Sequence, residues 1–168
     1  MAKAFFHYVC GKLLRNMDKP QSFSDDYFMK YALAEAQRAY ETGEVPVGAV
    51  VVHNDMVVAK AHNLTEKLKD ATAHAEMQAI TAAAYKLGNK YLKECTMYVT
   101  VEPCTMCAGA LDWSQISRLV YGAEDEKKGY RHFCNDSVFQ GVEITSGMLA
   151  AESSRLMKRF FRKLRNKR

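Results

Sequence analysis

The chain has 168 residues, of which 48% are hydrophobic and 26% are charged, a composition typical of a globular protein with a real core. No apolar run approaches the roughly 20 residues that a membrane-spanning helix needs, so we expect no transmembrane segment. The net charge of +5 is concentrated at the C-terminus, because residues 155–168 include eight basic residues and no acidic one. The remainder has 16 basic and 19 acidic residues, a net charge of −3. A basic C-terminus favours a polyanionic partner such as nucleic acid, or is the solvated cationic end of a helix.

The five cysteines show no regular disulfide spacing, and their odd number favours a reducing compartment, so we expect the protein in the cytoplasm. The apolar patch near the N-terminus is short and is interrupted by His7, which argues against a signal peptide. We expect residues 1–20 to be a flexible N-terminal extension and residues 21–168 to form a single domain that ends in a basic helix.

The first predicted element is a helix that begins among the capping side chains of Ser22–Asp25 and ends at Gly43. A β-branched run over residues 47–52 predicts a strand, and residues 56–59 predict a second strand after a short turn, which makes a hairpin. A polar connection over residues 64–71 follows. Thr72 can then cap a second helix that ends at Gly88, which places His74 in the first turn of that helix.

Residues 96–101 alternate and are rich in β-formers, which predicts a third strand. Pro103 breaks this pattern, and residues 104–113 predict a third helix. Two further strands are predicted at residues 119–121 and 142–145, separated by a long polar loop. A final helix begins near Met148, and its apolar stripe predicts the buried face. The residues of this stripe are Leu149, Leu156, Met157, Phe160, Phe161 and Leu164.

This order of helices and strands predicts an α/β protein: a five-stranded sheet covered by helices on both faces, in a three-layer α/β/α sandwich. The pattern contains no internal repeat and no linker between domains.

Two short clusters carry metal-binding chemistry. Cys104 and Cys107 lie one helical turn apart and share a face, at a helix N-terminus that favours thiolates. His74 supplies an imidazole, and a His/Cys/Cys set suits zinc, whose catalytic sites use three protein ligands and leave a fourth position for water. Cys95 lies at the far end of the third strand, where geometry disfavours it as a fourth ligand. The cysteine pair alone also fits a structural zinc knuckle or two reduced core thiols.

Glu76 follows His74 by two residues, and positions i and i+2 on a helix do not face each other. Its carboxylate is therefore better placed to approach the attacking water than to join the ligands. A glutamate beside a zinc site can carry protons in a hydrolytic reaction. The combination of His-x-Glu with Pro-Cys-x-x-Cys favours a catalytic zinc centre over a structural one.

The segments Thr72–Glu76 and Glu102–Ala110 resemble the signature of the zinc-dependent nucleobase deaminase superfamily. Within it, the chain is similar to bacterial tRNA-specific adenosine deaminases, over about residues 24–164. The further segments that carry this likeness are Gly43–Val50, Ala61–Asn63, Tyr98–Val101 and Val120–Ala123. The resemblance implies a cytidine deaminase-like fold with a mixed sheet, one zinc ion per subunit and a homodimer.

The resemblance also implies a reaction, the hydrolytic deamination of the wobble adenosine of a tRNA anticodon to inosine, with release of ammonia. His74, Cys104 and Cys107 would hold zinc, and Glu76 would be the proton carrier. The residues matched to the base pocket are Asn63 and Val47, and Asp125 is matched to a contact with the nucleotide backbone.

On the final helix, the residues expected to contact the anticodon stem-loop are Arg162, Lys163 and Arg165. The loop over residues 124–140 departs from the family pattern, since Glu124 stands where relatives often have arginine. Two alternatives stay open: a deaminase of a free base or nucleotide such as guanine or cytosine, and a zinc-stabilised RNA-binding module without turnover.

Overall fold

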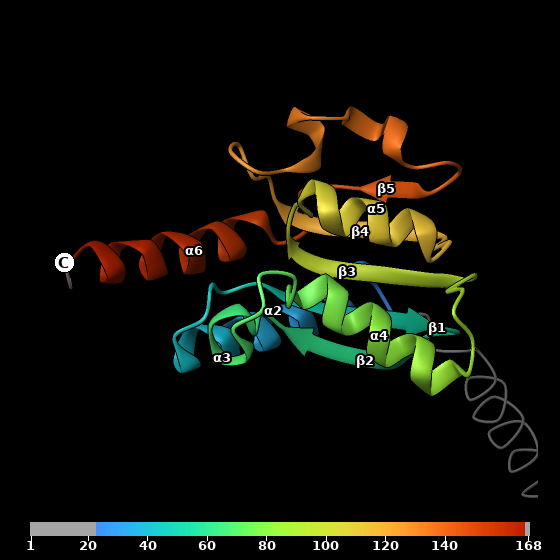
Figure 1. The fold of residues 1–168 in the computed structure, drawn as a ribbon, viewed down its shortest axis with the longest axis horizontal. Coiled ribbons are helices and arrows are strands. Elements are labelled where there is room, and N and C mark those ends of the chain that lie inside the picture. The colour runs from blue at the N-terminus through green and yellow to red at the C-terminus, as the bar shows by residue number, and fades with distance from the viewer. Residues whose placement is uncertain (1–22, 167–168) are drawn as a thin grey trace, which may run out of the picture.

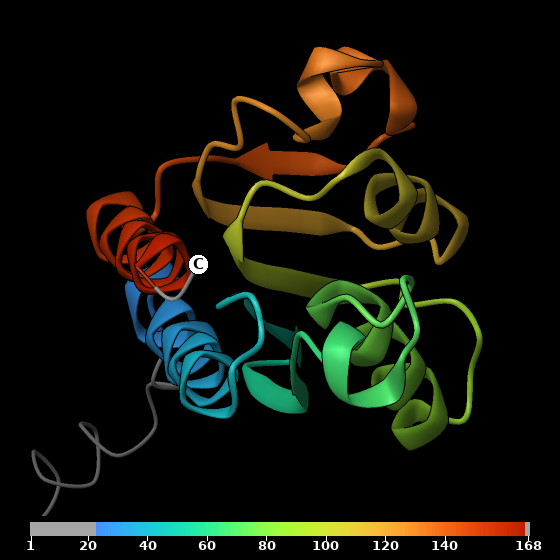
Figure 2. The ribbon, with the colours of Figure 1, turned by 60° about the vertical axis from the view of Figure 1, so that its left-hand side comes forward.

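The structure, a computed structural model, describes residues 23–166, and the predicted N-terminal extension lies outside them. A five-stranded sheet with strand order β2-β1-β3-β4-β5 forms the middle layer. Helices α4 and α5 cover one face, and α2 and α6 lie side by side on the other (Figures 1 and 2). The predicted three-layer α/β/α sandwich is therefore confirmed.

The strands are β1 (Gly48–His53), β2 (Met56–His62), β3 (Cys95–Val101), β4 (Arg118–Ala123) and β5 (Glu143–Thr145). The helices are α2 (Asp25–Thr42), α3 (Thr65–Leu68), α4 (Ala75–Leu87), α5 (Thr105–Trp113) and α6 (Ala150–Arg165), with short 3-10 turns η1 (Tyr130–His132) and η2 (Asn135–Val138). Strand β1 pairs antiparallel with β2 and β3, whereas β4 pairs parallel with β3 and β5, so the sheet is mixed as expected. No helix among the described residues is long and apolar enough to cross a membrane.

Helix α2 begins and ends as its sequence predicts. Ser24 caps it, since its hydroxyl accepts a hydrogen bond from the Tyr27 N–H at 3.3 Å. Gly43 ends it in the left-handed region at φ 83°, a conformation that costs glycine little.

The two faces of the sheet enclose two apolar cores. Val51, Met97 and Leu119 pack beneath α4 and α5 on one face. Val50, Tyr98 and Val120 pack beneath α2 on the other. Neighbouring residues along each strand therefore serve opposite cores, which is why β1 and β3 are apolar along almost their whole length.

Three predicted segments differ from the structure. Strand β2 extends to His62, beyond the predicted end at Ala59, because its pairing with β1 continues to Gly48. The polar connection predicted over residues 64–71 contains a short helix, α3. The segment after β4, predicted as a long polar loop, contains η1 and η2, because Tyr130 and Phe139 are buried and contact each other edge to face.

The predicted apolar stripe of the final helix is only partly buried. Phe160 is buried and packs against Tyr40, whereas Phe161 is 41% and Leu164 44% exposed. Helix α6 runs past the edge of the sheet (Figure 1), so its last turns have no strand beneath them. The stripe predicted a buried face correctly near the sheet and wrongly beyond it.

The topology brings the predicted site residues to one edge of the sheet. Gly48 pairs with His62, and Val101 pairs with Ala123, so the start of β1 and the ends of β2, β3 and β4 share this edge. Helices α4 and α5 begin there too (Figure 1). The segments before β1 and after β2, β3 and β4 therefore surround one region.

Candidate active site

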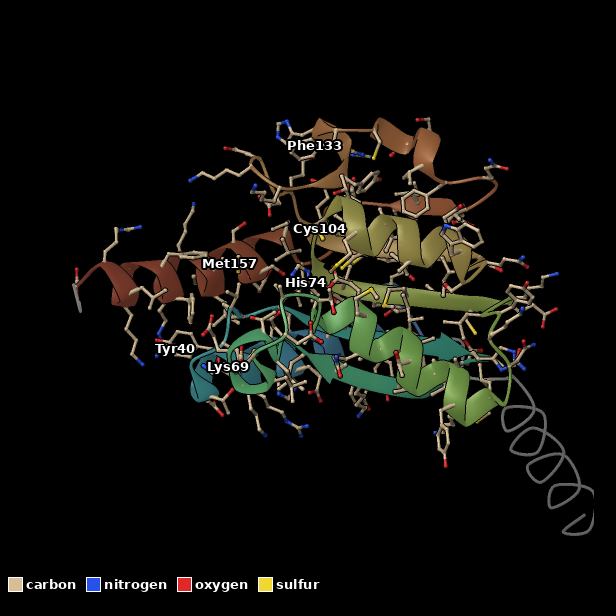
Figure 3. All side chains as sticks on the ribbon, in the orientation of Figure 1. Tyr40, Lys69, His74, Cys104, Phe133 and Met157 are labelled. Atoms are coloured by element: carbon tan, nitrogen blue, oxygen red, sulfur yellow. The ribbon has the colours of Figure 1, made fainter. Side chains whose placement is uncertain are left out.

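A histidine and two cysteines meet at this edge. His74 Nδ1 lies 3.6 Å from Cys104 Sγ and 3.5 Å from Cys107 Sγ. The three ligand atoms lie within 4.8 Å of one another, and no other metal-binding group of this kind occurs among residues 23–166. His74 and Cys104 lie close together at the starts of α4 and α5, on the face of the sheet that these helices cover (Figure 3).

Both helices begin at a ligand-bearing residue. His74 and Cys104 occupy the N-cap positions of α4 and α5 with extended backbones, and neither side chain caps its own helix. The N-cap of α4 is therefore His74, two positions later than the expected cap Thr72, and the helix begins at Ala75. The reason is local: the Thr72 hydroxyl and N–H both donate to Asp70 Oδ1, at 2.7 and 2.8 Å.

The dimensions of this group fit zinc. In a tetrahedral site with Zn–S near 2.3 Å and Zn–N near 2.0 Å, a nitrogen and a sulfur ligand lie about 3.5 Å apart. The observed separations of 3.5 and 3.6 Å match this value. The donor set, one imidazole and two thiols at helix N-termini, has the softness that zinc prefers.

The thiols differ in their acidity. The hydrogen bond from Cys107 is the largest of the effects that lower the pKa of the Cys104 thiol to about 4, and His74 adds to it. Donating that bond, together with burial, raises the pKa of Cys107. The hydrogen bond with Cys104 also raises the pKa of His74. Cys107 therefore keeps its proton while Cys104 gives one up readily, and both cysteines would have to be thiolates to hold a metal ion.

Glu76 lies beside this group and is 3% exposed. Burial raises the pKa of its carboxyl to about 7, and the nearby His74 partly opposes this effect. The carboxyl also hydrogen-bonds the Cys107 thiol. A group with this pKa accepts and releases protons readily at neutral pH.

Asn63 follows β2 and is buried, with its amide orientation fixed by a carboxylate. Its Nδ2 donates to Glu44 Oε2 at 3.2 Å and to Thr65 Oγ1 at 3.0 Å. Since a carboxylate only accepts, the amide nitrogen must face Glu44. Oδ1 accepts no hydrogen bond from the described residues. Val47, half-buried just before β1, accepts the Asn63 N–H through its carbonyl at 3.1 Å, so these two residues are neighbours.

Asp125 lies in the loop after β4, where its side chain accepts hydrogen bonds from the backbone of the turn that follows it. Its Oδ1 accepts the N–H groups of Lys127 and Lys128 at 3.0 and 3.1 Å. The structure therefore places Asp125 at the same edge as His74, with one carboxylate oxygen bound locally.

The basic residues at the end of α6 are exposed. Arg162 and Lys163 line a shallow surface depression together with Tyr40, Arg159 and Asn166. The Lys163 ammonium lies 5.3 Å from the centre of the Tyr40 ring. Arg165 is also exposed, and neither it nor Arg162 forms an ion pair within the described part of the chain. This end of α6 lies away from His74 and Cys104 and past the sheet edge (Figure 3).

Sequence patterns did not reveal two buried glutamates that organise the segments around the site. Glu44 is 1% exposed and accepts, besides Asn63 and Thr65, the N–H groups of Glu66 and Lys67 at 3.1 and 2.8 Å. Glu102 is 6% exposed and accepts the N–H groups of Asp125 and Arg131. Their only sequence signal was adjacency to a motif, since a glutamate usually indicates a surface position.

The chain is similar to known deaminases. Residues 23–165 match the MafB19-like deaminase family, so the chain belongs to that family. A tRNA-specific adenosine deaminase of Aquifex aeolicus is 46% identical over 84% of this chain and 96% of its own length. A solved structure from studies of A-to-I editing by tRNA:A34 deaminases at the wobble position of transfer RNA superposes with a TM-score of 0.72. It is 42% identical and covers 77% of this chain and 97% of its own. Within the deaminases, the chain is a member of the tRNA-specific adenosine deaminase family.

A more distant likeness concerns another substrate. The guanine deaminase of Bacillus subtilis is 36% identical with a TM-score of 0.58, over 61% of this chain and 66% of its own. The common fold therefore extends to a deaminase whose name specifies a free base.

Proposed function

We propose that the protein hydrolyses the amino group of the wobble adenosine in a tRNA anticodon, giving inosine and ammonia. The observation that carries this proposal is the buried Glu76 carboxyl, with its pKa raised to about 7, beside the His74, Cys104 and Cys107 group. The family supports adenosine in tRNA as the substrate. An RNA-binding module without turnover leaves the position and acidity of Glu76 unexplained.

His74, Cys104 and Cys107 would hold one zinc ion per subunit, consistent with the separations of 3.5 and 3.6 Å. When bound, zinc supplies Lewis-acid chemistry that lowers the pKa of a coordinated water to about 7. The extended backbones at the two helix N-termini direct His74 and Cys104 toward the same point, so folding prepares the site.

Glu76 would move the protons. Its carboxylate accepts a proton from the attacking water and passes one to the adenine ring nitrogen as the C6–O bond forms. It then takes the proton of the new C6 hydroxyl and passes it to the amino group, which leaves as ammonia as the C6–N bond breaks and the C6 carbonyl forms. Its surroundings exclude solvent, and this burial raises its pKa toward neutrality.

Asn63 and Val47 would form the base pocket. The Asn63 amide cannot rotate without turning its oxygen toward the Glu44 carboxylate, so its donor and acceptor sides are fixed before substrate binds. Val47 supplies an apolar surface next to it. Asp125 would contact the nucleotide backbone through the carboxylate oxygen that its own turn does not use.

Arg162, Lys163 and Arg165 would bind phosphates of the anticodon stem-loop. They are exposed on the part of α6 that extends past one edge of the sheet, the same edge at which the metal-binding group lies (Figures 1 and 3). Such contacts are electrostatic and weaken as salt rises.

We further expect a homodimer, as in the family that the sequence resembles, and a cytoplasmic location, where tRNA is modified and free thiols persist. The cysteines of the described part, at positions 95, 104, 107 and 134, are all free. Light scattering of the purified full chain at micromolar concentration measures the oligomeric state.

Incubation with an anticodon stem-loop bearing a wobble adenosine, and in parallel with free guanine and cytosine, tests the substrate. We expect ammonia and inosine from the stem-loop, and none from the same stem-loop with guanosine at the wobble position. Release of ammonia from the free bases alone would establish a free-base deaminase instead. The likeness to the guanine deaminase of Bacillus subtilis is the observation that motivates this alternative.

A further inference from the structure

Glu102 precedes the cysteine motif, yet its carboxylate binds a different segment. Oε2 accepts the N–H of Asp125 at 3.1 Å, and Oε1 accepts the N–H of Arg131 at 3.1 Å. Each carboxylate oxygen thus holds one end of the segment 125–131. Because Glu102 is 6% exposed, both hydrogen bonds are sheltered from water. A buried hydrogen bond to a charged acceptor stabilises the structure more than the same bond at the surface.

The backbone of this segment closes around the carboxylate. A Cβ added at Gly129 would lie 2.4 Å from Glu102 Cδ and 2.5 Å from Oε2, so only glycine fits at this position. Its φ of −57° is ordinary, and the requirement is therefore space rather than backbone conformation. A β-bridge joins Gly129 to Cys104, and the Tyr130 N–H donates to the Pro103 carbonyl at 2.9 Å.

We propose that Glu102 is a positioning residue that fixes the segment 125–131 against Cys104 at the start of α5, so that this segment meets the bound tRNA at a set distance from the metal-binding group. The proposal rests on the proposed function for the identity of the ligand. Glu102 does not contact the reacting atoms. It acts through Asp125 and through the loop that leads to Phe133.

The segment presents side chains suited to RNA. Lys127 and Lys128 are exposed next to Asp125, and Phe133 is 63% exposed just beyond Arg131. Phe133 lies above Cys104 at the same edge of the molecule (Figure 3). An exposed aromatic ring can stack on an unpaired base, and lysines can bind the adjoining phosphates. The buried ring of Tyr130 and its backbone bond to Pro103 hold this residue without Glu102, so the loss of Glu102 should free the backbone mainly at Asp125 and Arg131.

The test is Glu102→Gln, which keeps the shape of the side chain but turns an amide NH₂ toward one of the two backbone N–H groups. We expect one zinc per chain, as in the wild type, and faster amide exchange at Asp125 or Arg131. We also expect a KM for the stem-loop raised about tenfold with kcat within about twofold, since a contact made equally in the ground and transition states changes KM alone. Glu143→Gln, which removes an exposed carboxylate bound to Arg118, is the matched control.

Gly129→Ala provides an independent variant, because its methyl group must displace the same carboxylate and also the Asp125 carbonyl oxygen, which would lie 2.6 Å from it. It should reproduce the exchange and KM effects, and the double variant should be no worse than the more impaired single one. Unchanged exchange at both amides, loss of zinc, or a lower kcat at unchanged KM would each overturn the proposal. If the wild type does not deaminate the stem-loop, the proposed function fails, while the exchange measurement still decides whether Glu102 holds the segment.

Discussion

The buried glutamates around this site have two different roles, one structural and one in proton transfer. Glu44 and Glu102 accept hydrogen bonds from backbone and side-chain amide N–H groups, and these bonds hold neighbouring segments in place. Glu35 accepts from Arg38 and lies 3.0 Å from His62 Nδ1. Glu76 differs, because burial raises its pKa to about 7 and its neighbours are the candidate zinc ligands. The same residue type thus provides both the frame and the proton carrier.

Glu76→Gln should retain zinc and the fold but lose deaminase activity by about 100-fold or more, because the amide cannot carry protons. Turnover of the stem-loop and zinc per chain are the measurements. Glu66→Gln, an exposed change on α3, should leave both unaltered. Wild-type turnover in the Glu76 variant would show that another group moves the protons.

The pair of Asp25 and Arg118 should give a measurable dependence of stability on pH. The two N–H groups of Arg118 bind both oxygens of Asp25, at 2.6 and 2.8 Å, and this hydrogen bonding lowers the pKa of Asp25. The stabilisation is complete above the unfolded pKa of about 4 and is lost as pH falls through the lower folded value. Asp25→Asn should therefore be less stable in urea at neutral pH, by about 1 kcal/mol or less.

The difference between Asp25→Asn and the wild type should shrink as the urea experiment is repeated at pH values below about 4. A constant difference across this range would mean that packing, rather than the charge, makes the contribution.

At the scale of elements, β-branched runs and capping residues predicted the major helices and strands, because local preference and burial agree there. The candidate metal-binding group of His74, Cys104 and Cys107 could be predicted because its spacing reflects ligand chemistry. Helix α3 and the buried Glu102 could not, since their stability comes from contacts between segments distant in sequence. The exposed Phe161 and Leu164 were wrongly expected to be buried, because periodicity identifies a helix face but not where the sheet beneath it ends.

The end of α6 should contribute binding rather than catalysis. Reversing charge with Arg162→Glu and Lys163→Glu together should raise the KM for the stem-loop about tenfold at low salt, with kcat unchanged. The dependence of KM on salt should also become shallower, by about one unit of logarithmic slope per lost phosphate contact. Lys86→Glu together with Lys90→Glu, the same change in charge at and just after the end of α4, is the control. An unaltered salt dependence would place the tRNA elsewhere.

At the scale of the whole molecule, the metal should stabilise the fold, because its ligands come from two helices separated by β3. Ligand binding at 100 times its dissociation constant adds about 2.7 kcal/mol, so a chelator should lower Tm by about 5–10 °C. Zinc should restore the Tm. In His74→Ala the chelator should have little effect, and an equal loss there would show that the metal binds at another place.

The central claim is hydrolysis at C6 of the wobble adenosine with Glu76 as the proton carrier. The most direct measurement is mass spectrometry of a stem-loop incubated with the protein in water enriched in heavy oxygen. We predict inosine at the wobble position only, carrying one heavy oxygen atom, with none formed by zinc-loaded Glu76→Gln. Unchanged adenosine with the zinc-loaded wild type, or inosine formed equally by the variant, would contradict the account.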